Sequence, residues 1–223
     1  LSLLASYTNA KIIDDIGNPQ DNNNLRAERS ISTLDRPQRL AVTWVYDLPN
    51  RAQSAFGKTM LNNWTVNGFF VAQSGFPLTV INTTSGQGLG GVTNNVNGNG
   101  FSNVISGVPL IHPTGSTKDN LTQYVNRAAW SPAPAGTFGN SGRGMFRGPG
   151  QWNADVSLFK DFLMTERFRL QLRCEAFNIL NHANFALASD TGTTLNMNSA
   201  TFGQITSTSV NARLIQFALR LTR

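Results

Sequence analysis

Charged and apolar residues alternate one for one in the stretch RFRLQLRCEAFNIL, residues 167–180. Successive side chains of a β-strand point to opposite faces, so one face would carry Phe168, Leu170, Leu172, Cys174 and Ala176. The other face would carry Arg169, Gln171, Arg173, Glu175 and Phe177. The alternation persists for about ten residues, longer than the roughly five or six of a soluble strand and suited to a membrane-spanning strand of about 9 to 11. The stretch predicts a strand with a different solvent on each side.

Five more segments have the length and alternation of strands. They cover residues 1–12, 39–48, 63–75, 152–162 and 213–221. No apolar run approaches the roughly 18 residues of a transmembrane helix, but a transmembrane barrel hides its apolar residues at alternate positions. We expect an all-β fold in which about six long strands form an antiparallel, up-and-down segment of a transmembrane β-barrel.

The connections between these segments alternate strictly between long and short. Residues 163–165 and the segment DLPNRAQSAFGKTMLN, residues 47–62, form the shorter turns, and the other connections are long. An up-and-down sheet places all long connections at one end, as in outer-membrane barrels with short periplasmic turns and longer extracellular loops. We therefore predict a long extracellular loop at about residues 77–150.

Six strands are too few to close a barrel. Known single-chain barrels have roughly eight or more, and each unpaired backbone group at an open edge in lipid costs several kcal/mol. The chain opens in mid-pattern with LSLLASYT, so we expect further strands and any export signal upstream of it. A self-contained barrel that uses the β-like runs FSNVISG and LTQYVN, residues 101–107 and 121–126, remains an alternative.

The charge and the reactive residues exclude several function classes. A formal net charge of +6 could favour nucleic acid, but Lys and Arg are scattered and no nucleic-acid-binding motif is present, so we expect no nucleic-acid partner. Cys174 is the only cysteine, which excludes an internal disulfide. His112 and His182 have no metal-ligand spacing, and no nucleophile elbow occurs. We expect neither enzymatic activity nor a metal or cofactor.

Three local motifs have a structural and a functional interpretation. GQGLGG, residues 86–91, fits a dinucleotide-binding pattern but precedes no helix, which favours a flexible loop. GNSGRGMFRGPG, residues 139–150, reads as a tight turn, although Arg143 and Arg147 could line an extracellular vestibule. The aspartates of the first loop suggest a solvated loop more than a calcium site; they are Asp14, Asp15 and Asp21.

Several longer phrases resemble one family. They are RSISTLDRPQRLAVTWVYDLP (29–49), NNWTVNGFFVAQSGFPLTV (62–80), AGTFGNSGRGMFRGPGQWNADVSLFKDF (135–162), RLQLRCEAFNILNHANF (169–185) and FGQITSTSVNARLIQFALRL (202–221). In this order they resemble the C-terminal part of TonB-dependent outer-membrane receptors, in particular the Oar-like group of Acidobacteria with a carboxypeptidase-regulatory-like domain. The resemblance covers well over half of the chain.

This resemblance implies that residues 1–223 are the C-terminal part of a barrel of about 22 strands. It also implies a plug domain and a signal peptide outside this sequence. The implied activity is energy-coupled uptake of a large or scarce solute across the bacterial outer membrane. The implied partners are the TonB complex, the lipid bilayer of the outer membrane and an unknown extracellular ligand.

The alternation nominates residues that would face the lumen of such a barrel. They are Asn153, Asp155, Ser157, Arg169, Gln171, Arg173, Glu175, Gln216 and Arg220. In an intact receptor we expect these side chains to pair with each other or with the plug more often than with substrate. Two other function classes remain open: a barrel used in surface adhesion or protein secretion, and a secreted soluble β-sandwich with a binding role.

Overall fold

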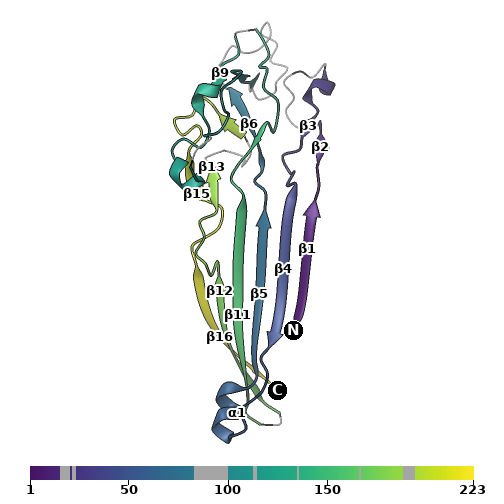
Figure 1. Ribbon diagram of the computed structural model, residues 1–223, viewed down its shortest axis with the longest axis vertical. Helices are drawn as coiled ribbons and strands as arrows, with labels where there is room; N and C mark the ends of the chain where they lie inside the picture. Colours follow the sequence, from purple (N-terminus) through teal and green to yellow (C-terminus); the bar gives the residue numbers. More distant parts are fainter. Residues whose placement is uncertain are drawn as a thin grey trace.

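The computed structural model describes residues 1–15, 21, 24–82, 100–112, 115–134, 136–165, 167–187 and 194–223, except for the side chains of Ala27, Asp119 and Thr194. Six long strands form one antiparallel sheet, in which each lies beside the next long strand of the chain. Across the sheet they are β1 (Ser2–Asn9), β4 (Gln38–Asp47), β5 (Trp64–Gln73), β11 (Gln151–Leu163), β12 (Arg169–Phe177) and β16 (Leu214–Thr222). The predicted up-and-down order is confirmed (Figure 1).

The first strand is shorter than the predicted range of 1–12. Pairing between β1 and β4 stops at Asn9, and a separate ladder follows between β2 (Ile13–Asp14) and β3 (Ser30–Ile31). Between the two ladders, Ala10 N donates to Pro37 O over 3.0 Å. Proline has no backbone N–H to return that bond, so the first ladder ends here.

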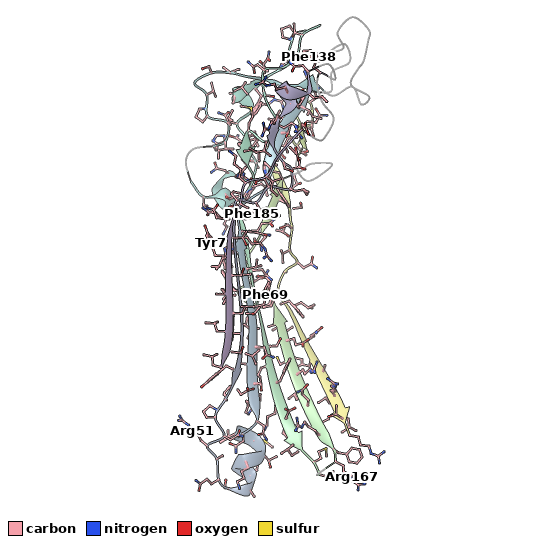
Figure 2. All side chains as sticks on the ribbon, turned by 90° about the vertical axis from the view of Figure 1, so that its right-hand side faces the viewer. Tyr7, Arg51, Phe69, Phe138, Arg167 and Phe185 are labelled. Atoms are coloured by element: carbon pink, nitrogen blue, oxygen red, sulfur yellow. The ribbon has the colours of Figure 1, made fainter. Side chains whose placement is uncertain are left out.

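The register assigns every strand residue to one of two faces, because paired residues of an antiparallel ladder point to the same side. What we call the polar face carries the odd-numbered residues of β4, β5, β11 and β12 and the even-numbered residues of β1 and β16. The apolar face carries the others. Every charged residue of the six strands, all of which are described, lies on the polar face except Lys160. Tyr7 of the apolar face and Phe69 of the polar face are labelled in Figure 2.

The connections at one end of the sheet are much larger than those at the other end (Figure 1). At the smaller end, which we call the α1 end, α1 (Ala55–Leu61) joins β4 to β5 and residues 164–168 join β11 to β12. The Ser54 side chain caps α1 by accepting a bond from Gly57 N over 3.1 Å, and Trp64 Nε1 donates to Met60 O over 2.9 Å. The sequence analysis treats this connection as a turn and does not predict the helix.

At the other end, the described parts of residues 74–150 and 178–213 build a folded unit that we call the head (Figure 1). Its elements are β6 (Pro77–Asn82), β7 (Gly100–Phe101), β8 (Asn103–Val104), η3 (Thr117–Asn120), η4 (Arg127–Ala129), β9 (Trp130–Ser131), β10 (Phe146–Arg147), β13 (Phe185–Leu187), β14 (Thr194–Asn196) and β15 (Ile205–Thr208). The connection between β1 and β4 contains η1 (Leu25–Glu28). The runs FSNVISG and LTQYVN contribute only β7, β8 and a single bridge, and add no strand to the six-stranded sheet.

A hydrophobic core holds the head together, and both long connections contribute to it. Val80 of β6 is fully buried and pairs in parallel with Leu195 of β14. Around this pair lie Leu78, Val125, Ala129, Trp130, Met197 and Phe202. Strands of two or three residues are too short to be stable alone, so the head forms only where the two connections meet.

A close contact on the apolar face gives a testable prediction. Trp44 and Gly68 are cross-strand partners, and a Cβ atom added to Gly68 would lie 1.9 Å from Trp44 Cζ2. The variant Gly68→Ala would displace the indole, and we expect it to lower the free energy of unfolding by about 1–3 kcal/mol. Urea unfolding of the protein in lipid vesicles measures this change. The double variant Trp44→Ala/Gly68→Ala should lose less than the sum of the two single variants, and additive losses would contradict the contact.

Candidate functional site on the polar face

The register brings all nine residues nominated from the sequence to the polar face. Three lie on β11, four on β12 and two on β16; they are Asn153, Asp155, Ser157, Arg169, Gln171, Arg173, Glu175, Gln216 and Arg220. Glu175 pairs with Ser157 on one side and with Gln216 on the other. The candidate site is therefore a continuous polar strip across three neighbouring strands.

Most of the charge in this strip is engaged within it. Gln171 Nε2 donates to Asp161 Oδ1 over 3.0 Å, and Arg173 Nε donates to Gln171 Oε1 over 2.6 Å. The Arg173 guanidinium also lies 5.0 Å from the centroid of the Phe159 ring, at cation–π distance. Arg169 Nη1 is 4.0 Å from Asp161 Oδ2. Asp161 is the centre of this network and was not nominated from the sequence, although its odd position in the alternation identifies it.

Glu175 and Asp155 have different partners. The Glu175 carboxylate accepts a hydrogen bond from Gln216 Nε2, which ties β12 to β16. Asp155 Oδ1 accepts from Asn153 Nδ2 and from Asn178 N, each over 2.8 Å. Asn178 follows β12 and has a φ of 49°, the left-handed region that asparagine tolerates better than most residues. Asp155 therefore holds the backbone where β12 ends.

Polar side chains also form hydrogen bonds with one another at the end of the polar face nearest the head. Gln151 Oε1 accepts from Gln73 Nε2 and from Arg36 Nη1, each over 3.4 Å, and Gln151 Nε2 donates to Ser209 Oγ over 2.7 Å. The Arg36 guanidinium lies 3.5 Å above the Phe76 ring. Burial, and secondarily the charge of Arg39, lower the pKa of Arg36. These contacts bind the connection after β3 to the base of the head.

The two arginines of the motif at residues 139–150 have structural contacts. Arg143 Nη2 donates to Asp14 Oδ1 over 3.0 Å and to Glu28 O over 2.9 Å. Arg147 forms an ion pair with Asp35, whose side chain is almost fully buried. Both pairs join the head to the connection between β1 and β4. This arrangement supports the structural interpretation of the motif over an exposed vestibule lining.

The other sequence motifs form no common site. GQGLGG lies outside the described residues. His182 stacks on Trp152 with ring centroids 3.9 Å apart. Among the residues that the structure describes, no group of three or more His, Cys, Asp or Glu side chains is placed to hold a metal ion.

Lys160 is a further residue that the sequence analysis missed. It lies on the apolar face near the α1 end and is 1% exposed. Its ammonium donates to Asn62 O and lies 4.9 Å from the Phe162 ring and 5.7 Å from the Trp64 ring. The sequence signal that could have identified it is a lysine at an even-numbered, apolar-face position of β11, followed on the same face by Phe162.

A comparison with protein families accounts for a sheet with two such faces. The model of a family described as an outer membrane beta barrel domain matches residues 1–216. The chain belongs to this family. Searches of curated proteins and of solved structures found no match.

Membership in the outer membrane beta barrel domain family identifies what surrounds each face and each end of the sheet. The six strands are a segment of a transmembrane barrel in the outer membrane, with the apolar face toward lipid. The head is on the extracellular side, because the long connections of such barrels are extracellular. No helix in the described part of the chain is long and apolar enough to span a bilayer.

The same family assignment explains the position of Lys160. Its strand position faces lipid near the periplasmic end of the wall. A charged group at that depth is tolerated when a long side chain reaches the membrane boundary and finds polar partners. The backbone carbonyls of Asn62 and Asp161 supply those partners here.

Proposed function

We propose that this chain forms part of the wall of a TonB-dependent outer-membrane receptor that imports a large or scarce solute. The polar face is the observation that carries the proposal. Its charged side chains are hydrogen-bonded to glutamine side chains across β11, β12 and β16, as expected for a wall with a wet or protein-filled interior. The family assignment supports an outer-membrane barrel, and the sequence resemblance supports the receptor class.

The edges of the sheet support a large barrel. β1 and β16 are the outermost strands and do not pair with each other within the described residues. Because unpaired backbone groups in lipid cost several kcal/mol each, the wall needs further strands to close. A barrel of about 22 strands has a lumen wide enough to hold a plug domain, which is the arrangement that the resemblance implies.

In this proposal the nine nominated residues line the lumen and contact the plug. Asp155, Arg173 and Glu175 are hydrogen-bonded to neighbouring side chains, so these charges are not available to select a solute. We therefore assign capture of the extracellular ligand to the head together with the plug. TonB would act through the plug, and no nucleic acid takes part.

Binding of TonB tests this proposal directly. The full-length protein, extracted from outer membranes in mild detergent, should retain the purified periplasmic domain of TonB from the same bacterium in a pull-down assay. A simple outer-membrane porin under identical conditions is the control and should retain none. Absence of binding, combined with loss of surface attachment or of a secreted protein when the gene is deleted, would favour the adhesion or secretion alternative instead.

A further inference from the structure

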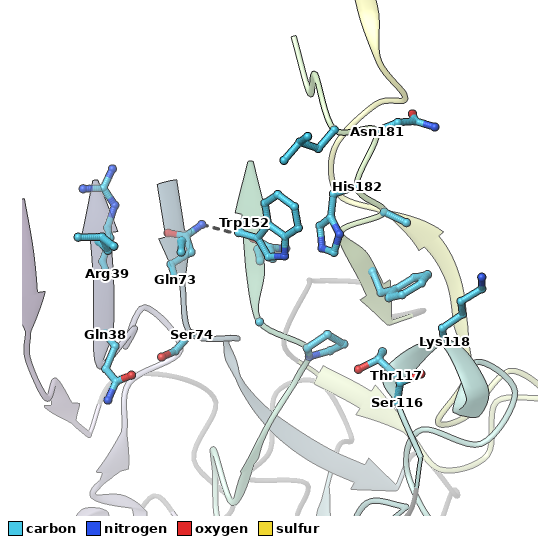
Figure 3. A pocket seen from close by; sticks show the side chains of 18 of the residues that line it. Gln38, Arg39, Gln73, Ser74, Ser116, Thr117, Lys118, Trp152, Asn181 and His182 are labelled. Carbon is cyan, nitrogen blue, oxygen red and sulfur yellow. Dashed lines mark hydrogen bonds between the residues drawn. The ribbon is translucent and has the colours of Figure 1, made fainter. Parts of the chain in front are cut away.

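A groove of about 1140 Å³ lies where the head meets the sheet (Figure 3). Its lining includes consecutive apolar-face positions at the head ends of four adjacent strands: Tyr7 of β1, Gln38 and Leu40 of β4, Ala72 of β5 and Trp152 of β11. Arg39, Gln73 and Gln151, the polar-face residues one position nearer the head, also border the groove. The next polar-face positions away from the head, Ala41, Val71 and Asn153, do not line it. Away from the head, the groove therefore continues along the lipid-facing side of the wall.

The floor of the groove is apolar and aromatic. Tyr7 is 62% exposed, and the Trp152 ring is held in place by the stacked ring of His182. Leu180 and Phe185, from the connection after β12, extend this surface. Tyr and Trp prefer the boundary between hydrocarbon and water, so these side chains mark the outer boundary of the membrane.

The opposite side of the groove is polar and belongs to the head. Ser116, Thr117 and Lys118 line it beside and within η3 (Figure 3). The Lys118 side chain is exposed. These three residues, which we call the overhang, place two hydroxyls and an ammonium group above the apolar wall, at the level where lipid headgroups lie. A lipid that contacted only the strands would not reach these polar groups.

We propose that this groove binds one phosphate-bearing lipid of the outer leaflet. Its acyl chains would lie against Tyr7, Leu40 and Trp152, and its phosphate would lie against Lys118 with the hydroxyls of Ser116 and Thr117. Two observations favour this occupant: the floor of the groove is continuous with the lipid-facing wall, and the overhang carries a cation on a chain with a formal net charge of +6. Charge-assisted bonds between an ammonium and phosphate oxygens are stronger than neutral ones.

The proposal depends on the outer-membrane location and not on transport. A barrel that served in adhesion or secretion would have the same groove. The bound lipid would hold the head against the wall, because it contacts the overhang and the strands together.

Titration with a defined lipid tests the site. Full-length protein, purified from outer membranes and stripped of lipid in detergent, is titrated with diphosphorylated lipid A while bound lipid is counted by native mass spectrometry. We expect one tight site in the wild type. The variant Lys118→Glu should weaken this site by about tenfold or more, and Lys118→Gln by less. The matched control Lys58→Glu removes an exposed lysine at the α1 end and should leave the site unchanged.

A second pair of measurements separates the headgroup from the chains. Lipid A without its phosphates should bind wild type and Lys118→Glu equally weakly. Ala72→Phe places bulk on the floor of the groove without changing the charge, and should weaken diphosphorylated lipid A in a protein that retains wild-type heat-modified gel mobility. Equal affinity of wild type and Lys118→Glu for diphosphorylated lipid A, or the absence of a tight site in the wild type, would overturn the proposal.

Discussion

Replacing Val156 by arginine should strongly reduce folding into the outer membrane, whereas replacing the adjacent Ser157 by arginine should be tolerated. Val156 lies on the apolar face of β11, midway between Trp152 and Lys160, and is paired with Gly68 and Ala176. An arginine at the midplane of a barrel's lipid face costs about 2–4 kcal/mol. Native proteins have net stabilities of about 5–15 kcal/mol, so this is a large fraction of the total.

Ser157 is the matched control because it lies at nearly the same depth in the membrane and its side chain is on the polar face. Its partner Glu175 lies beside it on the polar face and could pair with a new arginine. Leu172 is a less sensitive position than Val156, because it is the partner of Lys160 and lies near the periplasmic boundary. There a long side chain reaches polar groups.

Heat-modified gel mobility of outer-membrane fractions reports the folded share, and urea unfolding in vesicles reports the free energy. Val156→Arg should lose about 2–4 kcal/mol and Ser157→Arg less than about 1 kcal/mol. Equal losses at both positions would mean that the sheet does not separate lipid from a polar interior.

The second large effect is expected in the head, where Arg147→Met should release the connection between β1 and β4. Arg147 pairs with the carboxylate of Asp35 and also donates to Asp35 O over 3.1 Å and to Gly75 O over 3.2 Å. The Asp35 side chain is 1% exposed, so the substitution leaves a buried carboxylate with only the Ile12 N–H as donor in the described contacts. Removing one partner of a buried ion pair costs about 3–5 kcal/mol, and the partial exposure of Arg147 favours the lower value.

Proteolysis of whole cells measures this loss on the extracellular side. If opening is local, a loss of about 3 kcal/mol raises the cleavage rate within the head by about a hundredfold. The double variant Asp35→Asn/Arg147→Met should be cleaved more slowly than Arg147→Met alone, because the uncompensated charge is gone. Arg51→Met, an exposed arginine near the α1 end, should be cleaved at the wild-type rate.

The wall could be predicted from the sequence because its cause is local. Each strand separates two solvents, so the alternation is present in every strand and can be recognised without knowledge of its neighbours. Asp155 and Arg173 therefore fall on the polar face as expected. Among the charged residues of the six strands, the rule misplaces only Lys160, whose ammonium donates to a carbonyl in the connection before β5 that no pattern within β11 reveals.

The head could not be predicted in the same way. Its core joins Val80, Trp130 and Leu195, which are distant in the sequence and lie on elements of a few residues. Such runs are too short for a period to be measured. The ion pairs of Arg143 and Arg147 likewise depend on partners more than 100 positions away, and a glycine-rich motif gives no indication of them.

The parallel pairing of β14 with β6 limits how the extracellular part of this protein can change in sequence during evolution. Loops of outer-membrane proteins are exposed to phages and antibodies, and insertions in an independent loop are inexpensive. Here a deletion near Leu195 would leave Val80 without its cover, so the two loops must change length together or keep the length of their paired parts. We expect related sequences to vary in length away from β6 and β14, and recognition by phages or antibodies to shift through those segments.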